Sequence, residues 1–171
     1  MRSPELRERG KLIMVNENVR LEDVTIGFGG YRNFAGNKTE YNKAGERKFS
    51  VFLPQGVADE LEDLGWYIKH KPPYREGDDP QNQLDVAVAF DPYPPTVILV
   101  SHDGARTYLN EDNVGILDNT DIERADLEIR PYNWEVNGRT GTKAYVKELV
   151  VTAKPPRRAL NARMHRDEED F

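Results

Sequence analysis

Apolar and polar residues alternate along several short stretches of the chain, which is the pattern of β-strands with one buried face. The clearest stretch is 84–90, where Leu84, Val86, Val88 and Phe90 point the same way. Further strands are predicted at residues 11–15, 19–28, 49–53, 96–101, 106–109, 127–136 and 142–153, and residues 66–70 fit another. The pattern therefore predicts a mainly β protein built from many short strands.

One short helix is predicted between the strands, at residues 55–64. Pro54 ends the preceding strand and suits the start of a helix, and apolar residues recur at helical spacing from Val57 onward. Gly65 then supplies the left-handed residue that commonly ends a helix. Residues 110–124 contain capping residues and scattered apolar ones, so they allow a further turn of helix.

Long loops separate several of the predicted strands. Residues 29–47 are rich in Gly, Asn and Lys, and loops of this length inside a compact domain are usually functional or disordered. Residues 71–82 are rich in turn formers, and the pair Asn137-Gly138 predicts a tight hairpin. Together these features are typical of an OB-type five-stranded Greek-key barrel with extra strands, long loops and one or two short helices. A β-sandwich is the alternative, because sequence rarely separates the two folds.

The length of 171 residues fits one domain with a core and ragged ends. We expect a flexible N-terminus at residues 1–10, an OB-fold domain at 11–154, and a flexible linker with an acidic tail at 155–171. The N-terminus lacks the apolar segment of a secretory signal, and no run approaches the roughly 18 apolar residues of a membrane span. These features predict a cytoplasmic protein that has no membrane partner.

The charge balance argues at first against nucleic acid, because the net charge is −6 and nucleic-acid binders are usually basic. Four of these negative charges lie together at residues 167–170, however, and without them the rest of the chain has a net charge of −2. A body so close to neutrality can still hold a basic groove if its acidic residues face elsewhere.

The predicted hairpin at residues 130–147 interleaves aromatic and cationic side chains. The residues that would share its outer face are Arg130, Tyr132, Trp134, Lys143, Tyr145 and Lys147, with Arg139 in the turn. Single-stranded nucleic acid needs such a surface, because each base stacks on a flat ring for roughly 1–3 kcal/mol while cations neutralise phosphates. Leu149 and Val151 have the parity of Lys147, so a β-bulge is required there to keep both faces consistent. The alternative is that Tyr132 and Trp134 are core residues and the lysines are a solvated edge.

Two further segments have the same mixture of rings and cations. In the loop at 29–48, the candidates are Tyr31, Arg32, Phe34 and Lys48, and the loop after the first barrel strand helps to enclose ligands in OB-folds. In the segment 66–75, Trp66 is expected to pack against the helix, and the better candidates are Lys69, Lys71, Tyr74 and Arg75. A mobile surface loop remains the alternative for the first segment.

The last residues form an acidic tail that ends in an aromatic ring: Asp167, Glu168, Glu169, Asp170 and Phe171. Such a tail is suited to docking, because the ring can fill a pocket while the carboxylates meet Lys or Arg on a partner. The same tail could occupy the protein's own basic groove and compete with DNA. An acidic tail that only aids solubility is the alternative.

No segment of the sequence has the residues and spacing of a catalytic motif. The absence of cysteine excludes disulfides, thiolate zinc sites and a thiol nucleophile, and the three histidines have no metal-ligand spacing. The glycine-rich stretch 138–143 lacks the spacing of a phosphate-binding loop, and no helix is predicted to follow it. Carboxylates are plentiful, but their spacing selects no metal site, so a magnesium-dependent nuclease is the weaker reading. We therefore expect a non-enzymatic protein without metal or cofactor.

Several stretches carry a family resemblance: LEDVTIGFGGYRNFAG, FSVFLP, WYIKHKPP, VAVAFDPYPPTVILVS and RPYNWEVNGRTGTKAYVK. They resemble bacteriophage single-stranded DNA-binding proteins of OB fold over residues 19–153, and the acidic tail with its terminal Phe fits the same class. The resemblance implies a role in DNA replication and recombination, in which the tail recruits a polymerase, helicase-primase or recombinase. It also implies that the aromatic candidates stack bases and that the cationic candidates contact phosphates.

Rival interpretations stay open at this point. A phage structural or assembly β-module without nucleic-acid binding would explain the strands and the acidic surface, but neither the Phe-terminated tail nor the aromatic–cation segments. RNA binding would use the same side chains as DNA binding. The sequence also leaves open whether the protein forms a homodimer.

Overall fold

All the strands expected from the alternating pattern form, and they join in one sheet. The computed structural model describes residues 11–15, 17–73, 75–78 and 81–156. In this described part the strands are β1 (Lys11–Val15), β2 (Asn18–Ile26), β3 (Arg32–Asn33), β4 (Arg47–Leu53), β5 (Lys69–Lys71), β6 (Gln81–Val88), β7 (Thr96–Val100), β8 (Arg106–Leu109), β9 (Ile122–Val136) and β10 (Arg139–Ala153). The helical elements are α1 (Gln55–Asp63) and the 3-10 turns η2 (Gly29–Tyr31) and η3 (Val114–Asn119).

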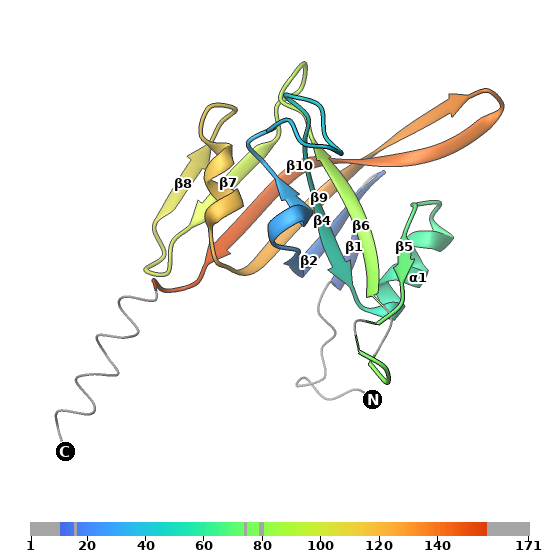
Figure 1. Cartoon of the computed structure of the whole chain (residues 1–171), viewed down its shortest axis with the longest axis horizontal. Coiled ribbons are helices and arrows are strands. Elements are labelled where there is room, and N and C mark those ends of the chain that lie inside the picture. The colour runs from blue at the N-terminus through green and yellow to red at the C-terminus, as the bar shows by residue number, and fades with distance from the viewer. Residues whose placement is uncertain (1–10, 16, 74, 79–80, 157–171) are drawn as a thin grey trace.

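Five of the described strands close into a ring in the order β2-β4-β6-β10-β9 and back to β2 (Figure 1). Every contact in the ring is antiparallel except that of β6 with β10, which is parallel. The other strands extend the ring: β1 pairs with β2, β3 with β4, β5 with β6, and the β7–β8 pair continues from β10. The mainly β prediction is confirmed, and the closed five-stranded ring with added strands is the arrangement that an OB-type barrel requires.

The core fills the inside of the ring with alternate residues of its strands. Leu84, Val86 and Val88 of β6 and Leu127 and Ile129 of β9 are all buried, as period-two strands require. Burying an aliphatic side chain of this size contributes about 1.5–3 kcal/mol. The inward-facing residues of these strands therefore contribute directly to the stability of the ring.

Helix α1 lies next to β4 in the chain and covers the core with its apolar face. Val57 and Leu61 are buried on this face, and Trp66 packs beside them with 6% of its surface exposed, as the sequence predicts. The helix ends in a Schellman motif, because the N–H of Gly65 donates to the carbonyl of Glu62 and that of Trp66 donates to Leu61. Gly65 has a φ of +96°, a left-handed conformation that favours glycine.

The predicted β-bulge is present in β10. The register between β9 and β10 shifts between Val146 and Glu148, so that Lys147 is the extra residue. Val146 points inward before the bulge and Leu149 points inward after it. The one-residue insertion therefore keeps apolar residues facing the core along the full strand.

Strands β9 and β10 are longer than the other strands of the ring, so their hairpin projects beyond it (Figure 1). Its outer half carries exposed residues on both faces, whereas the inner half alternates between buried and partly exposed ones. Within the described residues, no helix has the length and apolar character needed to cross a lipid bilayer.

Candidate nucleic-acid interface

A groove of about 1050 Å³ lies along β6, between the β9–β10 hairpin and the segment that enters β4. Its walls carry aromatic side chains and side chains of both charges. The aromatic ones are Tyr67, Phe90, Trp134 and Tyr145, the cationic ones are Arg47, Lys48, Arg139 and Lys143, and the acidic ones are Glu46, Asp85, Asp91 and Glu111. The groove has the size of a typical ligand pocket. It lies along β4 and β6, the second and third strands of the ring in chain order, and OB-folds bind oligonucleotides on the face of these two strands.

Tyr145 is the centre of an aromatic and cationic cluster on the hairpin. In the strand register Tyr145 lies opposite Arg130, and Lys143 lies opposite Tyr132. The ring of Tyr132 meets that of Tyr145 edge-on at 6.0 Å, while the Arg130 guanidinium carbon and the Lys143 Nζ each lie 5.1 Å from the centre of the Tyr145 ring. The hairpin therefore aligns its rings and cations on one face, as the sequence predicts.

Trp134 extends this cluster toward the tip of the hairpin. It lies opposite Gly141 in the register, and a Cβ atom placed on Gly141 would come within 2.4 Å of the indole Cζ2. Since no real Cβ contact is this short, the indole can rest against the strand only because residue 141 is glycine. The ring keeps 39% of its surface exposed and lines the groove.

Arg32 does not line the groove, which corrects the prediction that it contacts phosphate. Its Nε donates to the carbonyl of Gly27 at 2.6 Å, and its Nη1 donates to the carbonyls of Leu117 and Thr120 at 3.2 and 2.7 Å. Burial lowers its pKa, although nearby Asp118 and Asp121 oppose this effect. The guanidinium holds the loop after β2 against η3 and is not free to bind a ligand.

Phe34 belongs to the core, which corrects the prediction that it stacks a base. Its exposed fraction is 0%, and its ring stacks on that of Phe49 at 4.9 Å. The carboxylate of Asp118 accepts hydrogen bonds from the backbone N–H of Phe34 at 2.7 Å and of Ala35 at 3.0 Å. These contacts fix this part of the loop, so the ring cannot reach a ligand.

Tyr31 and Lys71 come together in a second aromatic and cationic cluster. The Lys71 Nζ lies 5.1 Å from the centre of the Tyr31 ring, and the Tyr31 ring meets Phe52 of β4 edge-on at 5.2 Å. Gly27 permits this approach, because a Cβ there would lie 2.6 Å from the Cβ of Tyr31. Both predicted residues are accessible, although they lie outside the groove lining.

Lys69 is tied to an acidic residue of the groove. Its Nζ lies 2.5 Å from Oδ2 of Asp85, whose other oxygen accepts hydrogen bonds from Ser50 and Gln83, each at 2.6 Å. Burial acts to raise the pKa of Asp85, but the hydrogen bonds from Lys69, Ser50 and Gln83 outweigh it and lower the pKa. Asp85 is therefore a charged partner for Lys69, and together they add little net charge to the groove.

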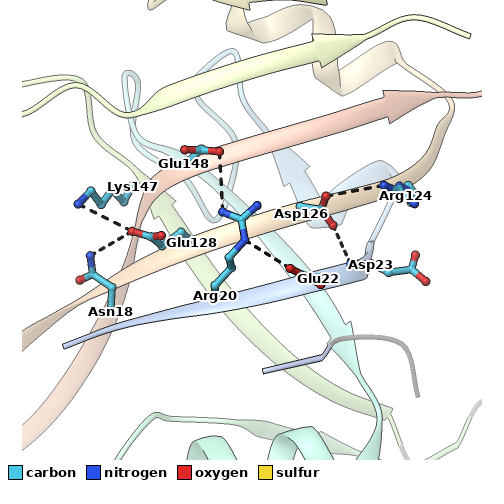
Figure 2. A network of polar contacts seen from close by, with 9 residues as sticks. All are labelled: Asn18, Arg20, Glu22, Asp23, Arg124, Asp126, Glu128, Lys147 and Glu148. Carbon is cyan, nitrogen blue, oxygen red and sulfur yellow. Dashed lines mark hydrogen bonds and ion pairs between the residues drawn. The ribbon is translucent and has the colours of Figure 1, made fainter. Parts of the chain in front are cut away.

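Lys147 points outward like Tyr145, but it lies beyond the residues that line the groove. Figure 2 shows it in a network of charged and polar side chains along β2, β9 and β10. Its Nζ lies 3.8 Å from Glu128, which also accepts a hydrogen bond from Asn18 at 3.2 Å. Arg20 in turn lies 3.9 Å from Glu148. The acidic neighbours offset the charge of Lys147, and its part in binding nucleic acid stays a prediction.

This polar network marks a change of character along the outer face of β9. Arg124, Asp126 and Glu128 belong to the network, whereas the next outward residues, Arg130 and Tyr132, belong to the Tyr145 cluster. Phosphates would meet repulsion on the first half of the strand and attraction on the second. The favourable surface therefore ends near residue 129.

Among the aromatic and cationic residues that line the groove, three are absent from the set chosen from the sequence: Arg47, Tyr67 and Phe90. The guanidinium carbon of Arg47 lies 5.6 Å from the centre of the Phe90 ring. The alternation at residues 84–90 predicts that Phe90 faces the core, and Tyr67 directly follows the buried Trp66. The only sign of these residues in the sequence was that Arg47 lies next to another cation, Lys48. The predicted partner-binding residues 167–171 lie outside the described part of the chain.

Solved structures of similar fold come from bacteriophage Enc34. Its single-stranded DNA-binding protein, in a C-terminally truncated form, matches with a TM-score of 0.54 and 10% identity, covering 85% of this chain and 97% of that one. The same protein in complex with ssDNA matches with a TM-score of 0.53 and 10% identity, covering 88% and 98%. At this identity the likeness establishes the fold alone.

Comparison with curated protein sequences finds no match. A family model gives the assignment that structural likeness at low identity cannot give. Residues 10–164, which include the whole ring, the groove and the projecting hairpin, match the model described as a putative phage ssDNA-binding domain, and the chain therefore belongs to that family.

Proposed function

We propose that this protein binds single-stranded DNA in the groove between the β9–β10 hairpin and the start of β4. The observation that carries the proposal is the hairpin face, where Tyr145 lies 6.0 Å from Tyr132 and 5.1 Å from Lys143. Exposed rings stack bases and adjacent cations neutralise phosphates, so one surface serves both parts of a nucleotide. Family membership and the likeness in fold to a protein solved with ssDNA support the same function.

Binding in this groove would be tolerant of sequence. Trp134 and Tyr145 offer flat ring surfaces, and every base has a face that can stack on them. Lys48, Lys143 and Arg139 are long, flexible cations suited to phosphates, which carry no sequence information. The proposed activity is therefore binding without catalysis, as expected for the family.

The strand would continue from the groove toward the Tyr31 cluster along the outer face of β4. Lys48 lines the groove, and Phe52, four residues further along the same strand, contacts Tyr31. Four residues of a β-strand span about 13 Å. Lys71 beside Tyr31 would then supply a cation at the far end of the path.

We further propose that residues 167–171 form a docking peptide for replication or recombination proteins, such as a polymerase, a helicase-primase or a recombinase. The composition supports this role, because four acidic residues precede a terminal Phe. The setting would be the cytoplasm of an infected bacterial cell. A homodimer stays a prediction that sedimentation can test.

The central test is a titration of intrinsic tryptophan fluorescence with oligo-dT, beside a duplex of equal length. We expect quenching by the single strand only, because Trp134 is exposed in the groove while Trp66 is buried. The logarithm of the association constant should fall with the logarithm of salt concentration by about 0.7 for each phosphate neutralised. Neither quenching nor a gel shift with oligo-dT would reject DNA binding and favour the structural β-module.

The tail is tested by deleting residues 167–171. If the acidic segment competes with DNA for the basic groove, the truncated protein should bind oligo-dT more tightly, above all at low salt. Weaker binding by the truncated protein would reject the competition. Capture of purified host polymerase, helicase-primase or recombinase by the full chain, and not by the truncated one, would support the recruiting role.

A further inference from the structure

Arg47 is a preorganised cation in the wall of the groove. It opens β4, and only 15% of its side chain is exposed. Its guanidinium carbon lies 5.6 Å from the centre of the Phe90 ring, a distance at which cation–π attraction holds the group in place. Because the stem is buried and the head is supported, Arg47 would lose little freedom on meeting an anion.

The polar contacts of this guanidinium are long. Its Nη1 lies 3.6 Å from the Glu111 carboxylate and 3.5 Å from the carbonyl of Gly45, and its Nη2 lies 3.5 Å from the carbonyl of Glu111. A charge-assisted hydrogen bond is normally about 2.7–2.9 Å. The Nε is buried and has no hydrogen-bond partner in the part of the chain that the structure describes. The donors of Arg47 are therefore only weakly satisfied.

Glu111 reaches Arg47 from a rigid turn but with an exposed side chain. The turn between β8 and η3 is held by Asn110 and Asn113, since Asn113 accepts from the N–H of Asn110 at 2.6 Å and Asn110 accepts from the N–H of Asp112 at 2.9 Å. The Glu111 side chain is 62% exposed. The carboxylate can thus turn into solvent without disturbing the fold, and at 3.6 Å from Nη1 it makes a weaker contact than a charge-assisted hydrogen bond.

We propose that Arg47 is a phosphate-binding residue that Glu111 occupies in the free protein, so that a DNA phosphate displaces the Glu111 carboxylate when the strand enters the groove. This inference rests on the proposed function of the groove. A phosphate can accept from Nη1 and Nη2 together, the two donors whose contacts in the free protein are long. Glu111 acts as a built-in counterion, which reduces the net number of ions released on binding.

The test compares Glu111→Gln with Glu46→Gln in titrations with oligo-dT over a series of salt concentrations. Glu46 is the matched control, because it also lines the groove but its carboxylate accepts from the backbone N–H of Lys43 at 3.3 Å. Both variants remove one negative charge from the groove. We expect Glu111→Gln to tighten binding about 3- to 10-fold at low salt and to steepen the salt slope by about 0.7, the value for one further phosphate. Glu46→Gln should leave the slope unchanged.

A second arm tests the dependence on the arginine. Arg47→Gln should weaken binding, and in the double variant with Glu111→Gln the steeper slope should disappear, while melting temperatures confirm that each variant is folded. Equal effects of Glu111→Gln and Glu46→Gln, or a slope that steepens without Arg47, would overturn the exchange. If the wild-type protein fails to bind oligo-dT at all, the proposed function itself fails, which is a distinct result.

Discussion

Substituting Gly141 by alanine tests whether Trp134 is a stacking platform set by its cross-strand neighbour. The added Cβ would lie 2.4 Å from Cζ2, 2.6 Å from Cε2 and 2.9 Å from Nε1 of the indole. Carbon atoms in contact prefer a separation of about 3.5–4.0 Å. The indole must therefore move by about 1 Å or more, away from the strand on which it rests.

The expected loss follows from the energy of one stacked base. Base–aromatic stacking contributes about 1–3 kcal/mol, so complete loss of the platform weakens oligo-dT binding roughly 5- to 150-fold. Fold stability should change by less than about 0.5 kcal/mol, because the site is on the projecting hairpin outside the core. The variant thus separates binding from folding.

The assay is fluorescence titration with oligo-dT, together with thermal unfolding. Thr142→Ala is the matched control, since Thr142 follows on the same strand but donates to Asn133 at 3.0 Å. Trp134→Ala provides the limit, and adding Gly141→Ala to it should cause no further loss. Wild-type affinity and wild-type quenching in Gly141→Ala would refute the idea that Gly141 sets the platform.

Three further changes test other parts of the structure. Phe34→Ala should lower the free energy of unfolding by about 3–5 kcal/mol in chemical denaturation, because the ring is fully buried; an unchanged stability would contradict its place in the core. Lys143→Gln should make the salt slope of oligo-dT binding shallower by about 0.7, and an unchanged slope would remove Lys143 from the phosphate contacts. His70 has a raised pKa because of its hydrogen bonds with Asn82 and then Glu62. Its contribution to stability is therefore complete below its unfolded pKa and lost as pH rises through the folded value, so the melting temperature should fall over that range in the wild type and not in His70→Gln.

The strands and the bulge could be read from the sequence because their signal is local. Alternation at 84–90 follows from neighbouring residues alone, and the parity conflict around Lys147 required the bulge that the structure contains. Tyr132, Trp134 and Tyr145 could likewise be assigned to one face, because a tight hairpin sets the register of both its strands.

The wrong assignments concern side chains whose position is determined by residues that are distant in sequence. Phe34 lies in a polar loop without periodicity, and it is held in the core through Asp118, which is 84 residues away in sequence. Lys69 and Lys147 look like free cations in the sequence, but in the structure they lie beside Asp85 and Glu128 on neighbouring strands. Composition shows which side chains are available to a ligand, but tertiary contacts determine which remain so.

The hydrogen-bonded register of β9 and β10 runs without a shift from the turn at Val136 and Arg139 to Ile129 and Val146, which are buried in the ring. The projecting hairpin is therefore anchored at one end in the core, and its strand pairing has no break that could serve as a hinge. Trp134 and Tyr145 keep their spacing before any ligand arrives. The conformational entropy lost on binding then falls mainly on the flexible DNA, whose bases must order themselves against a prepared template.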